Sequence, residues 1–93
     1  MNFECNSQLI SLASGFRLQY EPMQNAYVLL YPEGLVEMND EAASILFLCE
    51  RPIAFTHLVA KIEEIFAGQS LSEDVKEFLA GAYEQGWIKL TAK

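Results

Sequence analysis

The chain has 93 residues, of which 52% are hydrophobic and 20% are charged, and its formal net charge is −7. A chain of this length buries only somewhat more than about 60% of the surface of its unfolded state, so it holds a single core. Its composition is too apolar for a disordered protein, and its negative charge would repel nucleic-acid backbones and anionic membranes. We therefore expect one small folded domain whose partner is neutral or basic.

The cysteines and the start of the chain bear on its compartment. Cys5 and Cys49 share no metal-ligand or redox spacing, so we expect two free thiols in a reducing environment. No run approaches the roughly 18 apolar residues that would span a bilayer. Residues 1–15 lack the basic region followed by an apolar one that is typical of a secretory signal. These features predict a cytoplasmic protein.

Residues 1–14 show no sustained hydrophobic period and predict a loosely ordered N-terminal arm. Leu9, Ile10 and Leu12 could dock on the rest of the chain. The arm could equally add a strand or exchange with a second copy. Residues 15–91 are then expected to form the single domain.

Two strands come next. Residues 16–21 alternate with the two-residue period of a half-buried strand. One face carries Phe16, Leu18 and Tyr20, and the other carries Arg17, Gln19 and Glu21. Residues 26–31 (AYVLLY) form a continuous apolar run that is too short for a typical helix and rich in strand-favouring residues. They predict the central strand.

A hairpin follows the central strand. Pro32, Glu33 and Gly34 fit a three-residue loop, which leaves residues 35–38 as the third strand. That loop predicts the pairs Tyr31–Leu35, Leu30–Val36, Leu29–Glu37 and Val28–Met38. The expected faces are Val28, Leu30, Val36 and Met38 on one side, and Tyr27, Leu29, Tyr31 and Leu35 on the other.

The rest of the chain predicts three helices and an extended tail. Asn39 or Asp40 can cap the first helix, and Thr56 can cap the second, which Gly68 ends. Either a capping box of Ser70 and Glu73 or a cap at Ser72 opens the third helix, which Gly86 closes. Trp87, Ile88 and Leu90 begin the tail. The predicted fold class is α+β, a three-stranded antiparallel sheet followed by a three-helix, winged-helix-like bundle.

Candidate catalytic and metal-binding residues are few. His57 is the single histidine, beside a predicted helix cap, and no Ser or Cys has the spacing of a nucleophile motif. Glu63 and Glu64 are neighbours on the solvated face of a predicted helix. Neither metal ligands nor a phosphate-binding glycine loop occur at recognised spacings. We expect no enzymatic activity, no cofactor and no metal.

A winged helix could bind DNA, but the third predicted helix argues against this function. It carries Glu73, Asp74, Glu77 and Glu84 against the single cation of Lys76. A recognition helix needs Arg or Lys for phosphates and base edges.

The third strand is the candidate binding site. Its residues Leu35, Val36, Glu37 and Met38 include no Pro, Lys or inward-pointing charge that would blunt an edge, so an extended segment could pair with it. The third helix could wall such a groove with Val75, Phe78, Leu79, Ala82 and Tyr83; plain core packing is the alternative for these five. The predicted exposed apolar face of the sheet could also be covered by the N-terminal arm, or form a homodimer.

The run GFRLQYEPMQNAYVLLYPEGLVEMNDEAASIL, residues 15–46, resembles the pyrroloquinoline quinone (PQQ) biosynthesis protein D family, PqqD. The run DVKEFLAGAYEQGWI, residues 74–88, resembles the closing helix of that family. The resemblance implies a peptide chaperone that binds the precursor peptide PqqA and presents it to PqqE, a radical S-adenosylmethionine enzyme. It also implies that the peptide adds a strand beside the third strand and third helix, at the residues named above. The alternatives are a homodimeric interaction module and, less favoured, a DNA-binding winged helix.

Overall fold

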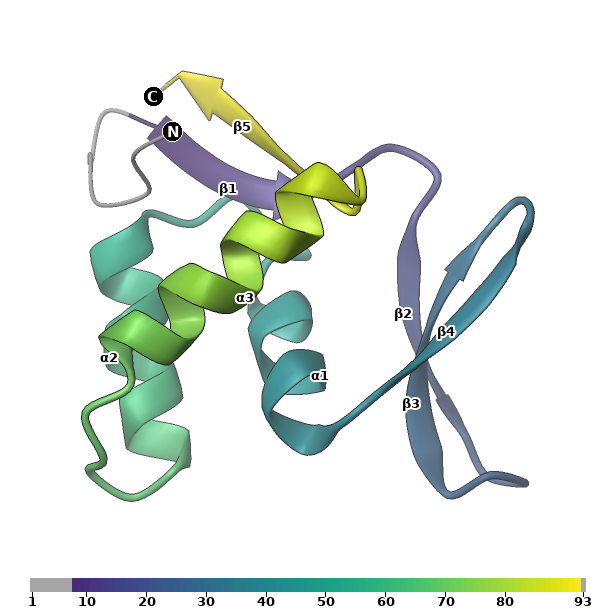
Figure 1. Ribbon diagram of the computed structural model, residues 1–93, viewed down its shortest axis with the longest axis horizontal. Helices are drawn as coiled ribbons and strands as arrows, with labels where there is room; N and C mark the ends of the chain where they lie inside the picture. The colour runs from purple at the N-terminus through teal and green to yellow at the C-terminus, as the bar shows by residue number, and fades with distance from the viewer. Residues whose placement is uncertain (1–7, 93) are drawn as a thin grey trace.

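The computed structural model describes residues 8–92 of the chain. Its elements are β1 (Gln8–Leu12), β2 (Arg17–Glu21), β3 (Ala26–Tyr31), β4 (Gly34–Met38), α1 (Asp40–Leu48), α2 (Phe55–Ile65), α3 (Ser72–Glu84) and β5 (Ile88–Ala92). The three helices lie together, and the sheet of β2, β3 and β4 stands beside them (Figure 1). This architecture confirms the predicted α+β class with a three-stranded antiparallel sheet and three helices.

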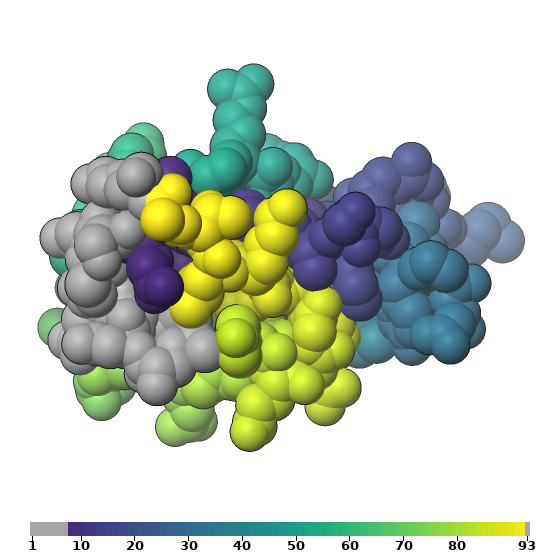
Figure 2. All heavy atoms as spheres, turned by 90° about the horizontal axis from the view of Figure 1, so that it is seen from above, coloured from purple at the N-terminus to yellow at the C-terminus, as the bar shows by residue number. Residues whose placement is uncertain are grey.

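The start of the described chain is paired. β1 and β5 form a two-stranded antiparallel sheet in which Ile10 lies opposite Leu90. On its other side Ile10 exchanges main-chain hydrogen bonds with Ile53, at 2.8 and 2.9 Å, in the loop between α1 and α2. Residues 8–12 thus adopt the added-strand alternative. Seen from above, β1 and β5 lie together beside α3 (Figure 2).

α1 covers the inner face of the three-stranded sheet. Its contacts reach β2, β3 and β4, and Ile45 and Leu46 are fully buried in the shared core. Leu18 and Leu29, which face each other across β2 and β3, join the same cluster. The alternation predicted for residues 16–21 holds at Arg17, which is exposed, and Leu18, which is buried, whereas Tyr20, on the same predicted face as Leu18, is 43% exposed.

The predicted register of the β3–β4 hairpin is wrong by one residue. The loop contains only Pro32 and Glu33, and the pairs are Tyr31–Gly34, Leu30–Leu35, Leu29–Val36, Val28–Glu37 and Tyr27–Met38. Gly34 begins β4 instead of ending the loop. The turns that two-residue hairpin loops favour need a positive φ at the first loop position, which Pro32 cannot adopt, so the sequence favoured the longer loop.

The shift exchanges the faces of the hairpin, because a slip of one residue turns every side chain of a strand over. The inner face carries Tyr27, Leu29, Tyr31, Val36 and Met38, whereas the outer face carries Val28, Leu30, Leu35 and Glu37. The predicted exposed row of Tyr27, Leu29, Tyr31 and Leu35 is therefore wrong, since Leu29 is fully buried in the core.

The outer face is screened by polar side chains from β2. Arg17 donates to the Gln19 side chain at 3.1 Å, and Gln19 donates to Glu21 at 3.0 Å. Val28 lies between Gln19 and Glu37 and is fully buried, although it is not part of the helix-packed cluster. The outer face is thus wet and polar along β2, as an antiparallel sheet with one solvated face normally is.

Of the three helix starts, one has the predicted side-chain cap. The Asn39 side chain accepts the Ala42 N–H at 2.8 Å and caps α1. α2 begins at Phe55 with no side-chain cap, so the predicted Thr56 cap is wrong. α3 begins after Leu71, whose N–H donates to the Glu63 carboxylate at 2.9 Å, in place of the predicted capping by Ser70 or Ser72.

Asn39→Ala should lower the free energy of unfolding by about 1 kcal/mol, because it leaves a helix N–H without its acceptor. Ser70→Ala is the matched control and should change that energy by less than about 0.5 kcal/mol, as ordinary surface substitutions do. Chemical denaturation of both variants measures the difference. Equal losses would contradict the cap assignment.

Candidate functional site

β4 is an edge strand of the three-stranded sheet, because the strand order is β2-β3-β4. It contains neither Pro nor Lys, and its single charged residue, Glu37, points to the outer face. Proteins usually protect a free edge with a Pro, a Lys or a charge that points to the inner face, and β4 has none of the three. A guest strand could therefore pair along Gly34–Met38.

The register determines which main-chain groups of β4 are free. A two-residue hairpin loop closes on a hydrogen-bonded pair, here Tyr31 and Gly34, and hydrogen-bonded pairs then alternate along an antiparallel ladder. Val36 and Met38 consequently direct their N–H and C=O groups to β3. Leu35 and Glu37 direct theirs away from the sheet, where a guest strand can receive them.

The side chains of β4 divide between the two faces. Leu35 is 48% exposed and lies beside Glu37 on the outer face, where both side chains are open to solvent. Val36 is half-buried and Met38 is buried, and both pack on the core cluster. A guest strand would meet Leu35 and Glu37 on one side and the rim of the core on the other.

The five residues predicted on α3 lie in three different environments. Val75, Leu79 and Ala82 are buried in the core, so their side chains support the helix and do not line an open surface. Phe78 is half-buried, and its ring lies 6.5 Å from the ring of Trp87. Tyr83 is 43% exposed.

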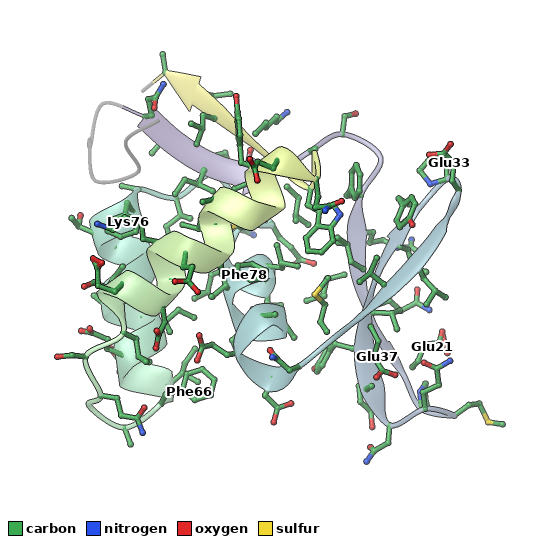
Figure 3. The ribbon with its side chains drawn as sticks, in the orientation of Figure 1. Glu21, Glu33, Glu37, Phe66, Lys76 and Phe78 are labelled. Carbon is green, nitrogen blue, oxygen red and sulfur yellow. The ribbon has the colours of Figure 1, made fainter. Side chains whose placement is uncertain are left out.

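Phe78 and Tyr83 point to different flanks of α3. Phe78 and Tyr83 are five residues apart, which corresponds to a rotation of about 140° around the helix. Lys76 and Tyr83 are seven residues apart and therefore share a flank. Figure 3 shows Phe78 on the flank toward the three-stranded sheet and Lys76 near α2. Phe78 therefore lies on the flank of α3 that is turned toward the three-stranded sheet. By the helical period, Tyr83 lies on the other flank.

The other chemically notable residues have structural surroundings. His57 is exposed in the first turn of α2. The Glu63 carboxylate, on α2, accepts the Leu71 N–H at the start of α3. Within residues 8–92, no group of three or more His, Cys, Asp or Glu side chains could hold a metal ion. No helix in the same residues is long and apolar enough to cross a membrane.

Cys49 is fully buried, and burial raises the pKa of its thiol from 9.0 to about 12. A buried neutral thiol is a poor nucleophile, because the thiolate is the reactive form. Cys49 therefore serves as a small apolar core residue. Cys5 lies outside the described residues.

The raised pKa makes stability depend on pH in one direction. The unfolded chain releases the Cys49 proton above pH 9.0 and the folded chain releases it near pH 12, so the folded state binds more protons between them. The free energy of unfolding should fall by up to about 1.4 kcal/mol per pH unit across that window. Denaturant titrations should show a shallower fall for Cys49→Ala; identical slopes would contradict the assignment.

The comparisons with known proteins agree with this geometry. The fold defines a winged-helix-like α+β domain in which β4 is an edge strand without Pro or Lys. Residues 26–88 match the family described as Coenzyme PQQ synthesis protein D (PqqD). The chain belongs to the PqqD family, which confirms the resemblance found in its sequence.

Curated relatives are similar over most of their length. A protein of Azotobacter vinelandii named "PqqA binding protein" is 48% identical over 80 residues, which cover 85% of this chain and 87% of that one. A protein of the same name from Pseudomonas fluorescens is 37% identical over 91 residues, 97% of this chain and 99% of the other. The match with the second extends the likeness over nearly all of the chain.

One solved structure shares the fold. The solution structure of the PqqD truncation of Methylobacterium extorquens PqqCD superimposes with a TM-score of 0.74 at 22% identity, covering 96% of this chain and 99% of that one. Its description calls that truncation a functional, stand-alone recognition element for ribosomally synthesised and post-translationally modified peptides. At this identity the likeness shows the fold.

Proposed function

We propose that this protein is a non-catalytic, cytoplasmic peptide chaperone of PQQ biosynthesis, which binds the precursor peptide PqqA and presents it to the enzyme PqqE. Its relatives carry the name "PqqA binding protein". The observation that carries the proposal is the free β4 edge, because it supplies main-chain donors and acceptors in the arrangement that an extended peptide needs.

The peptide would lie along Leu35, Val36, Glu37 and Met38 as a fourth strand. Leu35 and Glu37 would provide the ladder hydrogen bonds, each contributing about 1 kcal/mol net. Guest side chains on the inner face would approach Val36 and Phe78, and burying two or three of them would add roughly 1.5–3 kcal/mol apiece. Ordering the peptide offsets part of this gain, so micromolar or tighter binding is expected.

The buried α3 residues of the proposed site act through the backbone of their helix. Val75, Leu79 and Ala82 hold α3 against the core, and α3 in turn holds Phe78. A preformed wall lowers the ordering cost of binding.

Glu37→Pro should weaken binding of PqqA by about tenfold or more, because it removes an outward N–H and places a ring against the guest. The same change leaves the β3–β4 ladder intact, since the Glu37 N–H is not bonded to β3. Glu37→Gln keeps the N–H and is the matched control. Calorimetric titration with PqqA compares the two; equal affinities of folded Glu37→Pro and Glu37→Gln would rule out edge pairing.

Phe78→Ala should weaken PqqA binding roughly fivefold to thirtyfold, because it removes the aromatic wall of the groove. Tyr83→Ala changes an equally aromatic residue on the other flank of α3 and should leave the affinity within about twofold. Amide-shift titrations with PqqA would also locate the peptide. Shifts that avoid β4 and cluster around Tyr83 would place the peptide elsewhere.

A further inference from the structure

A second apolar surface is formed by residues outside β4 and α3, although one of them, Tyr27, pairs with Met38 of β4. It is a pocket of about 250 Å³, lined by Leu18, Tyr27, Asp40, Ala43, Ser44, Phe47 and Ile65. Its lining comes from β2, β3, α1 and α2. The start of α1, the start of β3 and the end of α2 lie at the lower end of the molecule in Figure 1. Neither β4 nor α3 contributes a lining residue.

The pocket gathers large side chains that the core leaves exposed. Phe47 is 58% exposed, Ile65 is 55% exposed and Tyr27 is 41% exposed. Tyr20, itself 43% exposed, extends the patch because its ring packs edge-on against Tyr27 at 5.1 Å. A single exposed apolar residue is ordinary, but four adjacent ones with a polar rim are typical of an interaction surface.

The patch is built from residues of α1, α2 and the three-stranded sheet. Asp40, Ala43, Ser44 and Phe47 follow the i, i+3, i+4, i+7 stripe of one helix face. This stripe borders the α1 face that packs on the core, and Tyr27 and Ile65 approach it from the sheet and from α2. The apolar face of α1 therefore continues past the core into solvent.

The size of the pocket indicates what it receives. Small-molecule sites usually have volumes of about 300–1,000 Å³, so 250 Å³ suits one large side chain of a partner protein. Asp40 is the single charged residue in the lining, and no cation lines the pocket. A carboxylate beside two aromatic rings is complementary to a cation whose stem is apolar.

Arginine fits this lining best. Its stem can lie along Phe47 and Ile65, and its guanidinium can stack on Tyr27 while it donates two hydrogen bonds to the Asp40 carboxylate. Arginine is also enriched among the residues that dominate protein interfaces. The net charge of −7 favours the approach of a basic surface over longer distances.

We propose that this pocket is the docking site for an arginine-bearing surface of a partner protein. The inference rests on the proposed function in one respect: the partner is the enzyme PqqE, to which the peptide is presented. The pocket and the β4 edge share no residue, and Tyr27 of the pocket pairs with Met38 of β4, so the peptide and the enzyme would occupy neighbouring surfaces. The protein would then hold the peptide at one surface and the enzyme at another.

The test measures binding of purified PqqE, with and without PqqA, by calorimetry. Phe47→Ala should weaken enzyme binding by about tenfold or more, and both it and Asp40→Asn should leave PqqA binding unchanged. Asp40→Asn should also flatten the salt dependence of enzyme binding. Met23→Ala, a 94% exposed residue of the β2–β3 turn, is the control and should change neither affinity.

Unchanged enzyme affinity in both pocket variants overturns the docking site, as does a wild-type protein that binds PqqA but not PqqE. A wild-type protein that does not bind PqqA would instead overturn the peptide-binding part of the proposed function. The titration with the enzyme would still test whether the pocket is its docking site. Sedimentation across a concentration range adds a further outcome. A wild-type dimer that Phe47→Ala dissociates, with no change in enzyme binding, would assign the pocket to a second copy and overturn the proposal.

Discussion

The register of the β3–β4 hairpin is the constraint on which the candidate site depends. With two residues in the loop, Tyr31 closes the ladder with Gly34, and every later pair follows from that one. The register sends Leu29 and Val36 into the core and turns the main-chain groups of Leu35 and Glu37 outward. A loop longer by one residue would reverse both assignments, and the free edge would then present different donors.

The helices hold this edge open by packing elsewhere. α1 alone spans the inner face of the sheet, while α3 lies against the two-stranded sheet through β5. The pairing of β1 with both β5 and Ile53 ties the two ends of the described chain to the α1–α2 loop. Since neither β1 nor β5 pairs with the three-stranded sheet, β4 keeps its outer groups unpaired by any other strand of residues 8–92.

Local patterns predicted the elements well and their mutual placement less well. The sequence predicts the central strand from the apolar run of residues 26–31, and α1 from the apolar stripe that ends at Cys49. Both patterns lie within a few neighbouring residues, so they could be recognised locally. The loop length was predicted wrongly, because Pro32 is unfavourable in the usual two-residue turns and therefore indicated the longer loop. At the start of α3 the Leu71 N–H is bonded to Glu63 of α2, and β1 forms by pairing with β5. Local sequence patterns do not show such pairings between separate elements. The helical period separates Phe78 from Tyr83 by about 140°, but it does not show which flank of α3 is turned toward the three-stranded sheet.

The two apolar surfaces differ in what they can recognise. The β4 edge offers main-chain groups, which bind any extended segment and gain selectivity from side chains at alternate positions. The pocket at Tyr27, Phe47 and Asp40 offers only side chains, and these select a particular shape and charge. The proposed chaperone would need both kinds of surface, one for the peptide and one for the enzyme. The two surfaces meet where Tyr27 pairs with Met38 but share no residue, so substitutions can be chosen that change one surface alone.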